Sequence, residues 1–181
     1  YNGDYQEGFR RFEQRFKWRL QSFLQFPYPK WEGEPGKTLY LVADQGLGDT
    51  LSFSRFVEAA ATRCEHIHAQ IQPELLRLFT YAFAYLSNVT LWPAPCPFPP
   101  ADVWSTFVSL PSALNLTDEE VRVAPHINYP AFSSGDPWKV VDRNLHVGIA
   151  WGGSPLNDID VHRNIPFRQF LELYRVPGIQ L

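Results

Sequence analysis

Residues 37–50 read Lys-Thr-Leu-Tyr-Leu-Val-Ala-Asp-Gln-Gly-Leu-Gly-Asp-Thr, and this stretch decides the fold of the chain. The apolar run at residues 39–43 predicts a buried strand, which leads directly into a turn containing Gly46 and Gly48. Apolar residues then recur at helical spacing over residues 50–62. A strand, a glycine turn and a helix in this order predict the first unit of a parallel α/β sheet.

The same alternation continues along the chain. Residues 65–71, 88–92 and 102–108 are typical of further strands, and residues 73–86 and 109–115 of helices. Strands that alternate with helices predict a doubly wound, Rossmann-like parallel sheet. We expect the four strands to form one parallel sheet with helices on both faces.

The chain divides into four parts by composition. We expect a helical segment at residues 1–26, a Pro- and Gly-rich linker at 27–36, a Rossmann-like domain at 37–140, and the start of a second Rossmann-like domain at 141–181. The segment 1–26 has aromatic and leucine residues at steps of three and four. Its other face carries Arg10, Arg11, Glu13, Arg15, Lys17 and Arg19.

The second domain is predicted from a repeat of the first pattern. Residues 133–137 are polar and rich in turn formers, which favours a domain boundary. The apolar run at 145–151 then leads into Gly152 and Gly153, and a helix is expected at 167–174. We therefore expect the strand at 145–151 to lie outside the first sheet, with some apolar surface of this lobe exposed or covered by another chain.

Composition excludes several classes of function. The 181 residues have a formal net charge of -3 and a pI near 5.9, without a basic run, which disfavours nucleic-acid binding. No apolar run is long enough for a transmembrane segment. Cys64 and Cys96 show neither metal spacing nor a disulfide framework, which favours a cytoplasmic protein. Because residue 1 is Tyr rather than Met, we expect further chain before it.

The glycine turn excludes two familiar phosphate-binding motifs. A P-loop needs Gly-Lys-Ser/Thr, whereas Gly48 is followed by Asp49 and Thr50, and the dinucleotide fingerprint needs a small residue where Leu51 stands. Ligands of parallel sheets bind beyond the carboxyl ends of the strands. An aspartate there suits proton transfer from, or hydrogen bonding to, a polar substrate. A turn with a purely structural role stays an open alternative.

Two histidines have a spacing that metal sites use. His66 and His68 alternate on an expected strand and therefore share one face. Because no third ligand is evident, we expect structural histidines and no metal site.

Several motifs in a fixed order resemble one family. They are Gly3-Asp4-Tyr5-x-x-Gly8, Glu13-x-Arg15, Trp31-x-Gly33-Glu34-Pro35, Gln45-Gly46-x-Gly48-Asp49, Trp151-x-Gly153-x-Pro155 and Arg163-x-Ile165-Pro166. The chain resembles the heptosyltransferase-like glycosyltransferases of family 9 over nearly its whole length. In particular it is similar to bacterial proteins in which tetratricopeptide repeats precede such a module, so that residues 1–26 would end a repeat array.

The resemblance implies a two-domain GT-B fold and inverting transfer of a sugar from a nucleotide-sugar to a hydroxyl of a glycan or protein acceptor. The nucleotide-sugar would be a substrate, and no cofactor is expected. The aspartate that the family uses as general base corresponds to Asp49, and the basic residue that meets the donor phosphate corresponds to Arg163. The other expected substrate-binding residues are Gln45, Gly46, Gly48, Thr50, Trp151, Gly152 and Ser154.

One departure from the family keeps a second class of function open. True heptosyltransferases have a basic residue at the end of the first strand, where this chain has Ala43-Asp44-Gln45. The alternative is a catalytically inactive module that binds protein partners together with tetratricopeptide repeats.

Overall fold

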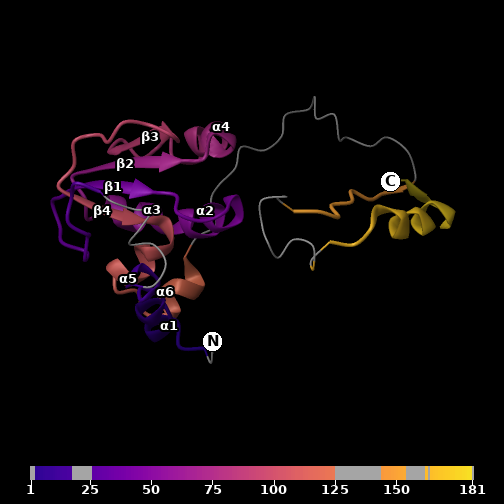
Figure 1. Ribbon diagram of the computed structural model, residues 1–181, viewed down its shortest axis with the longest axis horizontal. Coiled ribbons are helices and arrows are strands. Elements are labelled where there is room, and N and C mark those ends of the chain that lie inside the picture. The colour runs from indigo at the N-terminus through magenta and orange to yellow at the C-terminus, as the bar shows by residue number, and fades with distance from the viewer. Residues whose placement is uncertain (1–2, 18–25, 125–143, 154–161, 163, 181) are drawn as a thin grey trace. The chain divides into compact units, whose positions relative to one another are not determined.

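Four parallel strands form the centre of the first unit of the computed structural model, in the order β3-β2-β1-β4 (Figure 1). They are β1 (Thr38–Val42), β2 (His66–Ile71), β3 (Val89–Pro93) and β4 (Val103–Thr106). The structure describes residues 3–17, 26–124, 144–153, 162 and 164–180. The predicted parallel α/β sheet is confirmed, and its strand order is that of the first four strands of a Rossmann-like sheet.

The hydrophobic core lies on one face of this sheet. Leu39, Leu41, Ile67 and Ala69 are fully buried there, because alternate residues of a strand point to the same face. The helices that supply the other half of the core follow β1 and β2 in the chain. They are α2 (Leu47–Phe53), the 3₁₀ turn η2 (Ser54–Phe56), α3 (Val57–Ala61) and α4 (Pro73–Ala82), which begins at a proline suited to the first helical position.

The opposite face of the sheet is aromatic. Tyr40 of β1 is fully buried, and its ring lies 5.5 Å from that of Phe26 and 5.8 Å from that of Phe98. The ring of Trp104 in β4 lies 5.7 Å from that of Phe16 and 4.6 Å from that of Phe26. The N-terminal segment supplies Phe16 and Phe26, and the loop between β3 and β4 supplies Phe98, so these described contacts do not come from α2 to α4.

The segment expected as a linker, 27–36, packs along β4. The backbone N–H of Trp31 donates to the Trp104 carbonyl at 2.7 Å, and the Trp104 N–H donates to the Pro29 carbonyl at 2.9 Å. The Trp31 side chain is fully buried, and its indole N–H donates to the Glu34 carbonyl at 3.0 Å. This segment therefore extends the sheet beyond β4.

The N-terminal helix α1 (Tyr5–Phe12) lies beside α5 (Leu110–Ala113) and α6 (Asp118–Val123) (Figure 1). The first N–H groups of a helix have no partner within the helix. Here the Asp118 carboxylate accepts hydrogen bonds from the backbone N–H groups of Tyr5, at 2.7 Å, and Gln6, at 3.0 Å. Phe9 is buried in the core. The helix is thus fixed to residues more than a hundred positions away.

Several element boundaries differ from the prediction. The strand expected at 102–108 ends at Thr106, and the 3₁₀ turn η3 (Phe107–Ser109) precedes α5, whose Pro111 suits a first turn. In the helical segment expected at 1–26, helix α1 ends at Phe12, a turn follows at residues 13–14, and residues 15–17 are helical again, whereas residues 1–2 and 18–25 lie outside the described residues. Helix α6 was missed, although Thr117 and Glu120 form a capping box that predicts a helix start.

In the second unit, Ala131–Leu181, strand β5 (Leu145–His146) pairs in parallel with β6 (Ile179–Gln180) and is not part of the four-stranded sheet. The strand expected at 145–151 is therefore much shorter than predicted. The expected helix is present as a 3₁₀ helix, η5 (Phe167–Arg175). Large apolar side chains are exposed, as expected: Leu145, Trp151, Ile165, Phe167, Leu171, Tyr174 and Val176. The start of a second Rossmann-like domain stays a prediction, and its boundary at 133–137 lies outside the described residues.

Replacement of Gly33 by alanine tests the packing of the segment 27–36. Gly33 has φ +95°, and an added Cβ would lie 2.1 Å from the Ala113 carbonyl oxygen, whereas Gly36 has φ +69° and open space around it. Gly36→Ala should cost only the strain of a left-handed backbone, about 1–2 kcal/mol. Gly33→Ala should cost about 1–3 kcal/mol more, because it also overpacks α5. Urea unfolding measures both, and equal losses would contradict the packing described.

Candidate functional site

The turn after β1 lies at the carboxyl end of the sheet, beside the point where the strand order reverses. Strand β1 pairs with β2 on one side and with β4 on the other, and Val42 stands opposite both Gln70 and Thr106. In open parallel sheets ligands bind at such a switch point. Gln45, Gly46, Gly48 and Asp49 are exposed here, whereas Thr50 is buried and its hydroxyl donates to the Gly46 carbonyl at 3.3 Å.

Asp49 serves as a cap for its own helix. Its Oδ2 accepts a hydrogen bond from the Gly46 backbone N–H at 3.1 Å, which satisfies one of the free donors at the start of α2. The carboxylate is exposed to solvent and is not part of an ion pair in the described part of the chain. It is therefore accessible to a substrate hydroxyl, while it also has a structural role.

The backbone of the turn does not require glycine at positions 46 and 48, because it is not left-handed there. Neither Gly46 nor Gly48 has a positive φ. A Cβ at Gly48 would meet no atom within 4 Å. The described structure therefore gives no packing reason for a glycine at position 48. Alanine would also favour the helix more than glycine does. Glycine also permits close approach of a ligand to the backbone.

A buried polar cluster lies next to this turn, and the sequence did not predict it. The guanidinium of Arg15 reaches the ends of β1 and β4, where Nη2 donates to Ser109 Oγ at 2.7 Å and to Thr106 Oγ1 at 3.0 Å, and lies 3.4 Å from Asp44 Oδ2. Its Nη1 donates to Glu13 Oε1 at 2.7 Å. Thr106 and Ser109 are fully buried, and the side chain of Asp44 is only 1% exposed.

The environment of Asp44 disfavours its charged form. Burial raises the pKa of the Asp44 carboxyl above its ordinary value, and the positive charge of Arg15 opposes this shift. Among the described residues neither Asp44 Oδ1 nor Arg15 Nε has a hydrogen-bond partner.

The cluster continues outward through Glu13. Glu13 Oε2 accepts from Ser109 Oγ at 3.3 Å and pairs with the ammonium group of Lys30. The Arg15 guanidinium lies 4.1 Å from the ring centre of Phe16. Residues from the N-terminal segment, from the segment 27–36 and from two strand ends are thus joined by hydrogen bonds and ion pairs.

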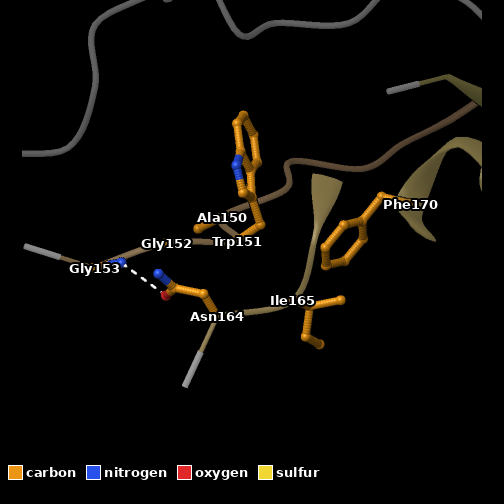
Figure 2. Close-up of a pocket in the computed structure, with 7 residues that line it drawn as sticks. All are labelled: Ala150, Trp151, Gly152, Gly153, Asn164, Ile165 and Phe170. Atoms are coloured by element: carbon orange, nitrogen blue, oxygen red, sulfur yellow. Dashed lines mark hydrogen bonds between the residues drawn. The ribbon is translucent and has the colours of Figure 1, made fainter. Parts of the chain in front are cut away.

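In the second unit, two of the four expected site residues, Trp151 and Gly152, lie on described backbone. A pocket of about 230 Å³ is lined by Ala150, Trp151, Gly152, Gly153, Asn164, Ile165 and Phe170 (Figure 2). The side-chain Oδ1 of Asn164 accepts a hydrogen bond from the Gly153 backbone N–H at 3.3 Å, and the ring centres of Trp151 and Phe167 lie 4.5 Å apart. Trp151 and Gly152 therefore line one pocket. Ser154 and Arg163 lie outside the described residues.

The two histidines of β2 are hydrogen-bonded on the aromatic face of the sheet. His66 Nε2 lies 2.9 Å from Thr90 Oγ1, and His68 Nδ1 accepts from the Trp92 indole N–H at 3.2 Å. Burial lowers the pKa of His68, and the neighbouring His66 adds to that shift. No group of three or more His, Cys, Asp or Glu side chains that could hold a metal ion is found in the described ranges.

Comparison with models of known protein families, with curated proteins and with solved structures finds no match for this chain. The family assignment therefore stays a prediction from the motifs. In the part of the chain that the structure describes, none of the helices has the length and apolar character needed to cross a membrane.

Titration of Asp44 tests the geometry of the cluster. We expect its carboxyl resonance in NMR spectra to titrate above the ordinary aspartate pKa of about 3.9. A carboxyl with a higher pKa in the folded state contributes stability at low pH, which is lost as the pH rises through that pKa. The free energy of unfolding of the wild type relative to Asp44→Asn should therefore fall as the pH rises from about 4. A pH-independent difference would contradict this expectation.

Proposed function

We propose that this chain is the acceptor-side domain, with the start of the donor-side domain, of a heptosyltransferase-like glycosyltransferase with the GT-B fold. The reaction is inverting transfer of a sugar from a nucleotide-sugar to an acceptor hydroxyl of a glycan or protein. The observation that carries the proposal is the exposed carboxylate of Asp49 at the switch point of the parallel sheet.

Each proposed role follows from the chemistry of the transfer. An acceptor hydroxyl needs a base within hydrogen-bond reach, and the departing diphosphate needs positive charge. Asp49 is the proposed base, with Gln45, Gly46, Gly48 and Thr50 forming the turn that presents it. Arg163 is the proposed partner of the diphosphate, since a guanidinium can bind two phosphate oxygens at once. Trp151, Gly152 and Ser154 are proposed to contact the donor.

A second candidate function has an observation in its favour. Because Asp49 caps α2, its presence is explained without any chemistry. In that case the chain is a catalytically inactive module that binds protein partners together with tetratricopeptide repeats. A donor panel distinguishes the two: absence of nucleotide-sugar hydrolysis and of transfer by the full-length protein favours the binding module.

Replacement of Asp49 by asparagine tests the proposed base. Asparagine keeps an oxygen that can accept from the Gly46 N–H, so folding should be retained. General-base assistance contributes typically 10²–10⁴-fold, so the turnover of Asp49→Asn should fall by about that factor. Turnover is measured with a nucleotide-sugar and a hydroxyl acceptor, and the melting temperature is measured in parallel.

Asp102→Asn is the matched control for this variant. Asp102 also accepts a backbone hydrogen bond, from the Thr38 N–H at 2.8 Å, but it lies at the amino end of the sheet, before β4. Its replacement should leave turnover within about a factor of two, since it lies away from the carboxyl ends where ligands bind. Normal turnover of Asp49→Asn, or an equal loss in both variants, would rule Asp49 out as the base.

Gly48→Ala separates a structural role of the turn from a binding role. With a compatible backbone and open space for the Cβ, the substitution should stabilise the fold by about 0.4–1 kcal/mol. If the acceptor approaches the backbone here, the same variant should have a higher KM for the acceptor. Urea unfolding and acceptor titration give the two readings. Higher stability with an unchanged KM would mean that no ligand approaches Gly48.

A further inference from the structure

The turn at residues 45–49 is held in place from two sides. On the side of β2, the Gln72 side-chain amide donates to the Gln45 carbonyl at 2.9 Å. On the side of β4, Asp44 precedes the turn directly, and its carboxylate lies in the buried cluster with Arg15. The position of the turn relative to β4 therefore depends on a residue that belongs to neither strand.

Arg15 connects the two strand ends across the switch point. A single nitrogen, Nη2, contacts Asp44 after β1 together with Thr106 and Ser109 at the end of β4. The other terminal nitrogen, Nη1, is directed to Glu13, which pairs with Lys30. Only the planar fork of an arginine can serve both directions at once, because a lysine ammonium is a single point charge.

The segment that carries Arg15 is anchored independently at its other end. Asp118 accepts from the first N–H groups of α1, and Arg122 Nη2 lies 3.4 Å from the Gly3 carbonyl oxygen. Arg15 is therefore brought to the strand ends by a segment that is fixed to α6. Its side chain is 90% buried, in contrast to Arg10 and Arg11 of the same segment, which are 70% and 76% exposed.

We propose that Arg15 is a positioning residue for the turn at residues 45–49. Through Asp44, Thr106 and Ser109 it sets the position of that turn relative to β4, so the N-terminal segment completes the candidate site. This role does not depend on the proposed sugar transfer. It holds equally if the site binds a partner without catalysis.

Amide hydrogen exchange tests the role without any assay of activity. The reporters are the N–H groups of Gly46, Asp49 and Thr50, which are hydrogen-bonded within the turn, and the reference is the N–H of Ile67, which donates to the Asn88 carbonyl. Arg15→Met, of similar length and without charge, should speed exchange at the reporters by about tenfold or more while Ile67 stays protected. Arg15→Lys should give an intermediate effect.

The matched control is Arg11→Met, which removes an exposed arginine that pairs with Glu7 in the same segment. In Arg11→Met, the N–H groups of Gly46, Asp49 and Thr50 should exchange as in the wild type.

A second measurement is the titration of Asp44. Since Arg15 lowers the pKa of Asp44, the Asp44 carboxyl should titrate at a higher pH in Arg15→Met, with Glu13 and Lys30 still in place.

Two outcomes overturn the proposal: unchanged exchange at the reporters in a folded Arg15→Met, or exchange that rises equally at the reporters and at Ile67. If Arg15→Met does not fold, Arg15→Lys is measured in its place. Faster exchange at the reporters alone then supports the role of Arg15, and exchange rates equal to those of the wild type overturn it. Loss of sugar transfer is not among these readings, so a failure of this proposal is distinct from a failure of the proposed function.

Discussion

Burial of the Asp44 carboxylate at the end of β1 is the constraint on which the candidate site depends. A carboxylate taken out of water is strongly destabilising unless a positive charge and hydrogen bonds compensate for the lost hydration. Strand β1 lies between two other strands, and its end has no nearby cation in sequence. The compensating charge comes from Arg15, 29 residues earlier in the chain. The N-terminal segment therefore supplies the charge that the buried end of β1 needs.

Docking of the segment in turn requires partners for its own polar groups. The first N–H groups of α1 are satisfied by Asp118, and Glu13 is paired with Arg15 and Lys30. Lys30 belongs to the segment that extends the sheet beside β4. The ends of β1 and β4, the N-terminal segment and the segment 27–36 thus meet around one buried carboxylate, while α6 holds α1 in place. A buried ion pair of this kind is weak evidence for stability, but removal of one partner leaves the other charge uncompensated.

The sheet could be predicted from sequence because its strands are buried and bounded by clear turn residues. The apolar runs that contain Leu39 and Ile67 alternate with helical periods, and this pattern survives in the structure. The run at 145–151 is also largely apolar, yet only Leu145–His146 is a strand, and Leu145 is exposed. An apolar run predicts a strand only where a partner strand and a core exist to bury it, and these are tertiary properties. The cluster was missed for a related reason: Glu13 and Arg15 fall on the charged face of the amphipathic helix that the sequence predicts, and sequence cannot separate a solvated arginine from a buried one there.

The two aspartates beside the glycine turn differ in what they can do, and the difference comes from their surroundings. Asp44 is enclosed by Arg15, Thr106 and Ser109, so a proton it gains or loses changes the stability of the strand ends. Asp49 lies five residues on, exposed, and holds one backbone N–H. Neighbouring carboxyls with contrasting environments allow one to maintain the site while the other meets the ligand. In this arrangement the buried charge fixes the end of β1, and the exposed carboxylate is presented from that fixed end.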